Sequence, residues 1–213
     1  MNLILDTGDT IGGVALARED ALVGSRVWSE AQRQSALLWP AISELLAEHT
    51  LDLRGLTGVV VCQGPGRLTG VRIGLTIAKT LCAQTALPLA AVSLFAQWAE
   101  GWRSESNERL VIASDRWGSR RGVQVFGPKG EPLAPPCAFE EETMIDELGA
   151  LLGDATAVLS GPGAMTLKER WPAAASLSAP TAKQLLEKLA RAGARLLHGG
   201  KTSDPLQVAP LSI

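Results

Sequence analysis

Histidine and cysteine, the residues that most often bind transition metals, are scarce in this chain. There are two histidines and three cysteines among 213 residues. His49 and His198 are isolated, and the cysteines lie far apart without metal-ligand spacing. We therefore predict no metal site and, since no Ser/His/Asp set can be assembled, no catalytic residue. Because Cys62 and Cys82 fall within apolar stretches, we interpret them as buried, reduced thiols.

The chain also lacks long apolar runs and an excess of basic residues. Its formal net charge of −2 and pI near 5.8 exclude a broadly basic surface that coats nucleic acid, though not a local basic patch. No run approaches about 18 apolar residues, and the first residues show no basic region, so we expect neither a membrane span nor a signal peptide. The composition, 46% hydrophobic and 20% charged, is that of a globular protein, which we expect in the cytoplasm.

The most informative stretch runs from residue 59 to residue 86. An apolar strand over 59–62 leads into the glycine-rich turn 64–70, and a helix is predicted over 71–86, ending before Pro88. Thr69 or Gly70 would cap this helix, and its free N–H groups could hold an anion. The same geometry could equally serve to bring two backbones close together. Because Val71 and Arg72 stand where a Walker-type loop needs Lys and Ser or Thr, we favour the structural interpretation over nucleotide hydrolysis.

A second candidate anion-binding turn follows the first predicted strand, residues 3–5. Asp6 and Gly8 there have the form of the first phosphate-binding hairpin of actin-like and sugar-kinase-like ATPases, in which the aspartate holds a metal-bound water. The counterpart turn, Asp115 to Gly118, has the wrong spacing, so intact ATP chemistry is not expected. A turn aspartate satisfied within the fold is an equal alternative for Asp6. The candidate anion-binding residues of the two turns are Asp6, Thr7, Gly8, Gly64, Gly66, Arg67, Thr69 and Gly70.

The apolar pattern predicts a mixed sheet covered by helices at the N-terminal end. The predicted order is strands 3–5, 11–17 and 21–28, helix 34–48, strand 59–62, helix 71–86, strand 89–92 and a helix through residue 98. Because residues 102–108 are polar, we place a boundary there between two lobes, 1–102 and 103–213. In the second lobe we predict strands 110–113, 121–126 and 157–159, helices 140–152 and 181–197, a loop over 114–120 and a tail draped over the surface.

The two long helices of the first lobe are too apolar for ordinary surface helices. Apolar positions cover about 200° of the wheel of helix 34–48, and in helix 71–86 only a narrow stripe, which contains Arg72, is polar. A surface helix needs an apolar arc of only about 100°. We therefore predict a shared, partner-binding patch, although burial of the helices against each other and a loop is an alternative. The predicted partner-binding residues are Leu37, Leu38, Ala41, Ile42, Leu45, Arg72, Ile73, Thr76, Ile77 and Thr80.

Several of these motifs occur together, in the same order, in one known family. They are Asp6-Thr7, Leu37-Leu38 followed by Pro40, Gly64-Pro65-Gly66 with Thr69-Gly70-Val71-Arg72-Ile73-Gly74, and Pro88 with Val92-Ser93. Together they resemble the TsaB, or YeaZ, family of threonylcarbamoyladenosine biosynthesis proteins. The match covers the first hundred residues well and the second half weakly.

The chain departs from the family pattern at several places. Arg67-Leu68 stands in the glycine-rich loop where the family has Ser-Phe, and Gln34 replaces a histidine that is usual in the family. The segment D-A-R-x-G-E-V-Y of the family is represented only by Ser114-Asp115-Arg116, and the usual tail Tyr-Leu-Arg is absent, because the chain has no tyrosine.

The resemblance implies an α/β fold of the actin/Hsp70/sugar-kinase (ASKHA) class, with two lobes that each contain a mixed sheet covered by helices. It implies a non-catalytic scaffold that pairs with and activates a catalytic TsaD-like subunit through its first two helices and works with a TsaE-like ATPase. That complex modifies the adenosine beside the anticodon of tRNAs reading codons that begin with A. ATP and a metal would be bound by the partner subunits and tRNA by the complex, and the chain could also form a homodimer. A small ATP-dependent phosphotransferase of the sugar-kinase-like class is the alternative.

Overall fold

The chain folds into two compact units in the computed structural model, which describes residues 1–9, 12–29, 34–211 and 213. Unit 1 comprises Met1–Gln97 and Pro180–Ser212, and unit 2 comprises Trp98–Ala179 together with Ile213. The predicted division into 1–102 and 103–213 differs from this, because the last helix, α6 (Ala182–His198), packs on the sheet of unit 1. No local sequence pattern indicates that the chain returns to the first sheet.

Unit 1 contains a five-stranded mixed sheet in the order β3-β2-β1-β4-β5. Its strands are β1 (Asn2–Asp6), β2 (Gly12–Arg18), β3 (Ala21–Trp28), β4 (Gly58–Cys62) and β5 (Leu89–Val92). The first three strands pair antiparallel, as the predicted meander requires, and β4 and β5 continue the sheet in parallel with β1. The mixed sheet is thus confirmed, while residue 11, the predicted start of β2, lies outside the described residues.

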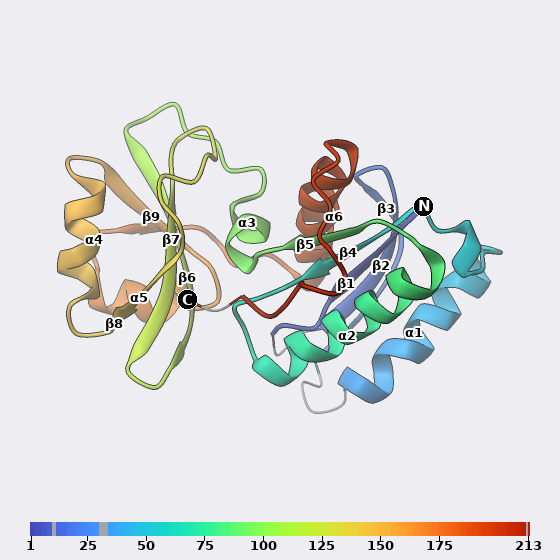
Figure 1. Cartoon of the computed structure of the whole chain (residues 1–213). Helices are drawn as coiled ribbons and strands as arrows, with labels where there is room; N and C mark the ends of the chain where they lie inside the picture. The colour runs from blue at the N-terminus through green and yellow to red at the C-terminus, as the bar shows by residue number, and fades with distance from the viewer. Residues whose placement is uncertain (10–11, 30–33, 212) are drawn as a thin grey trace. The chain divides into compact units, whose positions relative to one another are not determined.

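Helices cover both faces of this sheet (Figure 1). The helices α1 (Gln34–Glu48) and α2 (Leu68–Thr85) lie side by side on one face, and α6 covers the other. The short helix α3 (Leu94–Ala99) carries the boundary between the two units, and a 3-10 turn, η2 (Leu53–Gly55), precedes β4. Pro40 lies inside α1 rather than at its start.

Unit 2 contains a second five-stranded mixed sheet, in the order β10-β9-β6-β7-β8. Its strands are β6 (Glu108–Trp117), β7 (Arg120–Phe126), β8 (Cys137–Glu140), β9 (Thr156–Ser160) and β10 (Ala175–Ser176). The helices α4 (Met144–Leu152) and α5 (Ala164–Arg170) bury apolar side chains against it, including Leu148 and Leu167. Two mixed sheets covered by helices agree with the predicted fold class.

Three local predictions for unit 2 were wrong. Residues 114–120 do not form a loop, because β6 continues to Trp117 and pairs with Arg120 across a tight hairpin whose Gly118 has a φ of +63°. The helix predicted from residue 140 begins at Met144, since residues 137–140 pair with β7 as an edge strand. The short helix α5 was not predicted. No helix in the described part of the chain is long and apolar enough to cross a membrane.

The orientation of α1 corrects part of the predicted partner-binding patch. Four of its predicted partner-binding residues, Leu38, Ala41, Ile42 and Leu45, lie in the core of unit 1, with at most 7% of their surface exposed. The apolar arc of α1 is wide because the helix packs against both the sheet and α2. These four residues therefore hold unit 1 together and are not exposed on its surface.

The orientation of α1 gives a testable contrast between two neighbouring residues. We expect Leu38→Ala to lower the free energy of unfolding by about 2–5 kcal/mol, since it leaves a cavity in the core. Trp39 is 46% exposed, and Trp39→Ala should cost clearly less. Denaturant unfolding followed by circular dichroism measures both values, and equal losses for the two variants would contradict this orientation of α1.

Candidate functional site

The glycine-rich loop and the turn after β1 meet at one corner of unit 1. Helix α2 begins at Leu68, three residues earlier than predicted. Its N-cap is Arg67, which makes no side-chain capping bond, so the prediction that Thr69 or Gly70 caps the helix is wrong. Thr69 and Gly70 instead belong to the first turn of α2.

The two backbones are in direct contact at this corner. The N–H of Arg67 donates to the carbonyl oxygen of Gly8 (2.7 Å), and the hydroxyl of Thr7 donates to the carbonyl oxygen of Gly70 (2.7 Å). A Cβ atom on Gly66 would lie less than 3.0 Å from the carbonyl oxygen of Gly8. A Cβ atom on Gly70 would likewise lie less than 3.0 Å from the carbonyl oxygen of Thr7. Only glycine fits at either position. The carbonyl oxygens turned toward the start of α2 would repel an anion, which favours the structural interpretation of this loop.

The side chain of Asp6, at the end of β1, is engaged within unit 1. Its Oδ2 accepts a hydrogen bond from Nε2 of Gln97 (2.6 Å), and its Oδ1 accepts one from the N–H of Gly8 (3.3 Å). Burial raises the pKa of Asp6 above its ordinary value, against the effect of both hydrogen bonds. Both carboxylate oxygens thus have donors inside the protein, as expected of a turn aspartate satisfied within the fold.

Two buried glutamines, neither of which was predicted to lie there, complete the corner. Gln97, in α3, is 1% exposed and also donates to the carbonyl oxygen of Leu185 in α6 (3.1 Å). Gln34, at the start of α1, is 1% exposed and donates to the carbonyl oxygen of Asp9 (2.7 Å). An amide inside an otherwise apolar helical stretch, such as Leu94–Ala99, is the signal that could have revealed Gln97.

The remaining predicted partner-binding residues lie on or beside the outer surface of the helix pair. Arg72, Thr76 and Thr80 are exposed and spaced by four residues, so they form one ridge along α2, which we call the α2 ridge. Ile73 and Ile77 are half-buried beside it and pack partly against the core. Leu37 of α1 is also half-buried. The exposed part of the predicted patch therefore lies mainly on α2.

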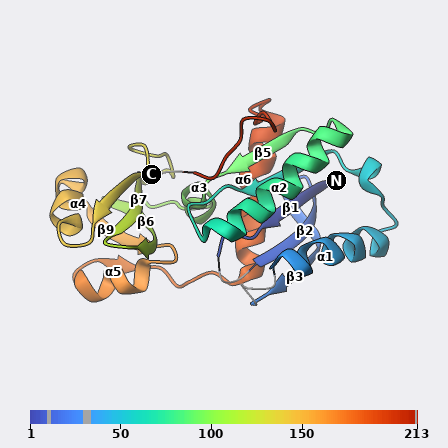
Figure 2. The same cartoon turned by 60° about the horizontal axis from the view of Figure 1, so that its bottom comes forward.

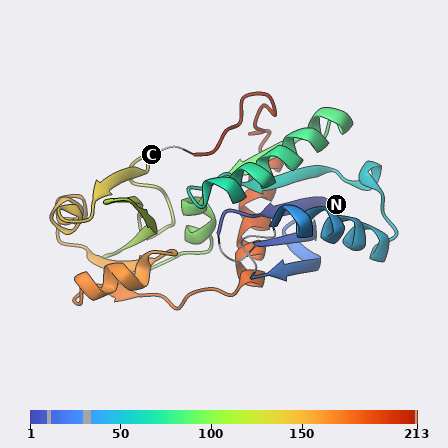
Figure 3. The ribbon, with the colours of Figure 1, turned by 90° about the horizontal axis from the view of Figure 1, so that it is seen from below.

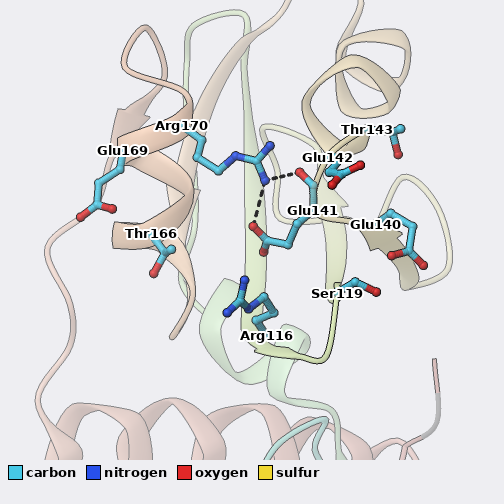
Figure 4. A pocket seen from close by; sticks show the side chains of 9 residues that line it. All are labelled: Arg116, Ser119, Glu140, Glu141, Glu142, Thr143, Thr166, Glu169 and Arg170. Carbon is cyan, nitrogen blue, oxygen red and sulfur yellow. Dashed lines mark hydrogen bonds and ion pairs between the residues drawn. The ribbon is translucent and has the colours of Figure 1, made fainter.

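Unit 2 has a separate pocket of about 630 Å³ with a mixed polar lining (Figure 4). Glu141, one of the residues that line it, forms ion pairs with two arginines. The carboxylate of Glu141 pairs with Nε of Arg121 (2.5 Å) and with Nη1 of Arg170 (3.0 Å), which also donates to the main-chain oxygen of Glu141. Arg121 is 2% exposed, and its Nη1 donates to the carbonyl oxygens of Ser114 (2.7 Å) and Gly163 (3.2 Å). The lining residues are Arg116, Ser119, Glu140, Glu141, Glu142, Thr143, Thr166, Glu169 and Arg170.

This ion-pair network lowers the pKa of Glu141. Burial by itself would raise that pKa, but the hydrogen bonds and charges of Arg121 and Arg170 outweigh it. A buried guanidinium that lost its carboxylate would be left uncompensated. The network therefore has a structural role, tying β7 to α5 and to the segment after β8.

Comparisons with known proteins agree with the motifs and the fold. The model of the family TsaD, described as tRNA N6-adenosine threonylcarbamoyltransferase, matches residues 27–115. The tRNA threonylcarbamoyladenosine biosynthesis protein TsaB of Bacillus subtilis is 38% identical over 91 residues, which are 43% of this chain and 40% of that protein. A solved structure from Pseudomonas aeruginosa, described as an uncharacterized protein with similarity to peptidase YEAZ, superposes with a TM-score of 0.80 at 25% identity, over 99% of this chain and 98% of that one. Over these spans the chain is similar to proteins of the TsaB/YeaZ family.

The sequence match and the fold match to TsaB/YeaZ proteins differ in extent. The aligned sequence covers about two fifths of the length of the Bacillus relative, whereas the fold matches over nearly the whole Pseudomonas structure. An activator of 2-hydroxyisocaproyl-CoA dehydratase from Clostridium difficile, solved with bound ADPNP, superposes with a TM-score of 0.51 over 99% of this chain and 98% of its own, at 10% identity. That likeness concerns the fold alone. The fold is that of the actin/Hsp70/sugar-kinase class.

The glycine contact at the corner can be tested with a matched pair of variants. Gly70→Ala should lower the free energy of unfolding by about 1–3 kcal/mol, because the added Cβ meets the Thr7 main chain and the backbones must separate. Gly149→Ala in α4 meets nothing within 4 Å and should stabilise the protein by about 0.5–1 kcal/mol. Denaturant unfolding of both variants provides the comparison, and a neutral Gly70→Ala would mean that the two backbones are not in contact.

The network around Glu141 predicts a pH dependence of stability. Because the folded protein holds the pKa of Glu141 below its ordinary value of 4.5, the stabilisation is present above pH 4.5 and is lost as the pH falls through the folded pKa. Glu141→Gln should lower the free energy of unfolding by about 3–5 kcal/mol at neutral pH, since Arg121 stays buried without its counter-charge.

Urea unfolding of the wild type and of Glu141→Gln between pH 3 and pH 7 measures this dependence. The difference between the two proteins should shrink toward the acid end. A difference that stays constant over the whole range would show that the two arginines do not lower the pKa of Glu141.

Proposed function

We propose that this chain is a non-catalytic scaffold subunit of the complex that makes threonylcarbamoyladenosine beside the anticodon of tRNAs reading codons that begin with A. Its similarity to TsaB and TsaD proteins and the names of these relatives support a place in this pathway. In this proposal it pairs with and activates a TsaD-like catalytic subunit. A TsaE-like ATPase and the tRNA join the assembly, ATP and metal are bound by the partners, and the isolated chain can form a homodimer.

The observation that carries the non-catalytic role is the closed corner of unit 1. The phosphate-binding hairpin of ATPases in this fold class needs open N–H groups and an aspartate that is free to hold a metal-bound water. Here the Gly8 main chain lies against Gly66, and Asp6 accepts hydrogen bonds from Gln97 and Gly8. Phosphate and a hydrated metal would have to displace main chain and a buried amide, so this corner serves to connect β1 and α2.

The surface that we propose for pairing is the α2 ridge with the adjoining apolar side chains. Arg72, Thr76 and Thr80 offer an exposed charge and two small polar groups, and Ile73 and Ile77 extend the apolar surface beside them. A helix pair with a partly exposed apolar seam gains stability when a partner covers that seam.

The first test is the mass in solution of this chain alone and mixed with the TsaD-like subunit of the same organism. We expect a 1:1 complex, and threonylcarbamoyl transfer only when both chains are present. A chain that neither pairs nor stimulates transfer would overturn the proposal. In that case the ATP-dependent phosphotransferase is next, and calorimetry with magnesium and ATP at millimolar concentration would detect its nucleotide site.

The proposed surface predicts the effect of a bulky charge on α2. Thr76→Arg should weaken the pairing at least tenfold, because the larger side chain and its charge stand in the middle of the α2 ridge. The thermal midpoint should stay unchanged, since Thr76 is exposed. Ala150→Arg, at an exposed helical position of α4 in unit 2, is the matched control and should pair like the wild type. Equal affinities for both variants in a titration would place the pairing surface elsewhere.

A further inference from the structure

The C-terminal segment of unit 1 runs along the free edge of the first sheet. We call residues 203–211 the strap. At its beginning, Ser203 forms an antiparallel bridge with Leu89 at the start of β5, the edge strand, with its N–H donating to the Leu89 carbonyl oxygen (2.7 Å). At its end, the N–H of Leu211 donates to the carbonyl oxygen of Gln63, just after β4 (2.8 Å). The strap is therefore attached to the sheet at both ends.

A third attachment joins the strap to α2. The ammonium group of Lys79 donates to the carbonyl oxygen of Val208 (3.0 Å), and the Val208 side chain packs partly against the core of unit 1. At 100° per residue, Lys79 flanks the α2 ridge on the side opposite Ile73 and Ile77. Figures 2 and 3 show the strap beside α2, on the side away from α1. The α2 ridge is thus bordered by α1 on one side and by the strap on the other.

The middle of the strap is a fixed turn that presents one leucine. The side chain of Asp204 accepts a hydrogen bond from the N–H of Leu206 (2.8 Å). The main-chain carbonyl oxygen of Asp204 accepts hydrogen bonds from the N–H groups of Gln207 (3.0 Å) and Val208 (2.9 Å). Pro205 restricts the backbone inside this turn. Leu206 is nevertheless 84% exposed, the highest value among the large apolar side chains in the described part of the chain.

A rigid, exposed leucine has a physical consequence. Single exposed leucines are common on protein surfaces, and a leucine on a flexible segment loses conformational freedom when it binds. Here the hydrogen bonds of Asp204 and the contact between Lys79 and Val208 have already fixed the backbone. Burying the side chain in a partner removes apolar surface from water with little further loss of conformational freedom.

We propose that Leu206 is an anchor residue that extends the pairing surface of the α2 ridge and inserts into an apolar pocket of the catalytic partner subunit. This inference rests on the proposed function and deepens it. Leu206 is two residues from Val208, a span of at most about 7 Å of chain, so it stays close to the point where the strap is fixed to Lys79. Lys79 is a positioning residue in this scheme, since it holds the turn beside α2.

The experiment is a titration of each variant with the TsaD-like subunit of the same organism. Leu206→Ser should raise the Kd at least tenfold while leaving the thermal midpoint unchanged. Met165→Ser is the matched control, because Met165 is 68% exposed on α5 of unit 2 and should contribute nothing. Lys79→Met should weaken binding by a smaller factor, and Lys79→Arg, which can still donate to the Val208 carbonyl oxygen, should restore it.

The outcomes separate this inference from the function on which it rests. If Thr76→Arg weakens pairing and Leu206→Ser does not, the anchor is refuted and the α2 ridge stands. If both variants bind like the wild type, the proposed pairing surface fails as a whole. An effect of Leu206→Ser that Met165→Ser matches, or one that changes only the self-association of the isolated chain, would also overturn the anchor.

Discussion

The contact between two glycines and one turn determines the arrangement of unit 1. Gly66 and Gly70 let the start of α2 lie against the main chain of Thr7 and Gly8, at distances that no Cβ would allow. This approach fixes α2 on the sheet, and with it the positions of the core residues of α1 and of the α2 ridge. A loop that could hold an anion in other proteins here joins two parts of the backbone, since main-chain atoms occupy the space in front of it.

Hydrogen bonding at Asp6 agrees with this steric constraint. A buried carboxylate needs donors, and Gln97 and Gly8 provide them, while Gln97 also reaches α6. One acidic side chain thereby connects β1 with α3 and α6. The buried pair of Arg121 and Glu141 has the same kind of role in unit 2, where it connects β7 with the segment after β8. Both networks are polar groups whose burial is compensated inside the protein, so neither requires a ligand.

The surfaces that remain for function lie outside these networks. Unit 1 has buried the inner sides of α1 and α2 in its own core and leaves exposed the α2 ridge, which consists of one arginine and two threonines. The strap borders this ridge and spans from β5 to the end of β4. The proposed pairing uses this combination of a rigid base and an exposed helical surface.

The sequence by itself determined the order of strands and helices in the first hundred residues, the mixed sheet and the similarity to TsaB proteins, because these follow from local apolar periodicity, glycine turns and a long motif. It also indicated that α1 and α2 are unusually apolar. Only the tertiary structure decided which of their side chains are core: Leu38 and Ile42 face the sheet, whereas Thr76 faces solvent. The return of α6 to the first sheet, the pairing of Gln97 with Asp6 and the path of the strap were likewise decided there. Each of these depends on contacts between residues about 90 or more positions apart, and local sequence patterns do not encode such contacts.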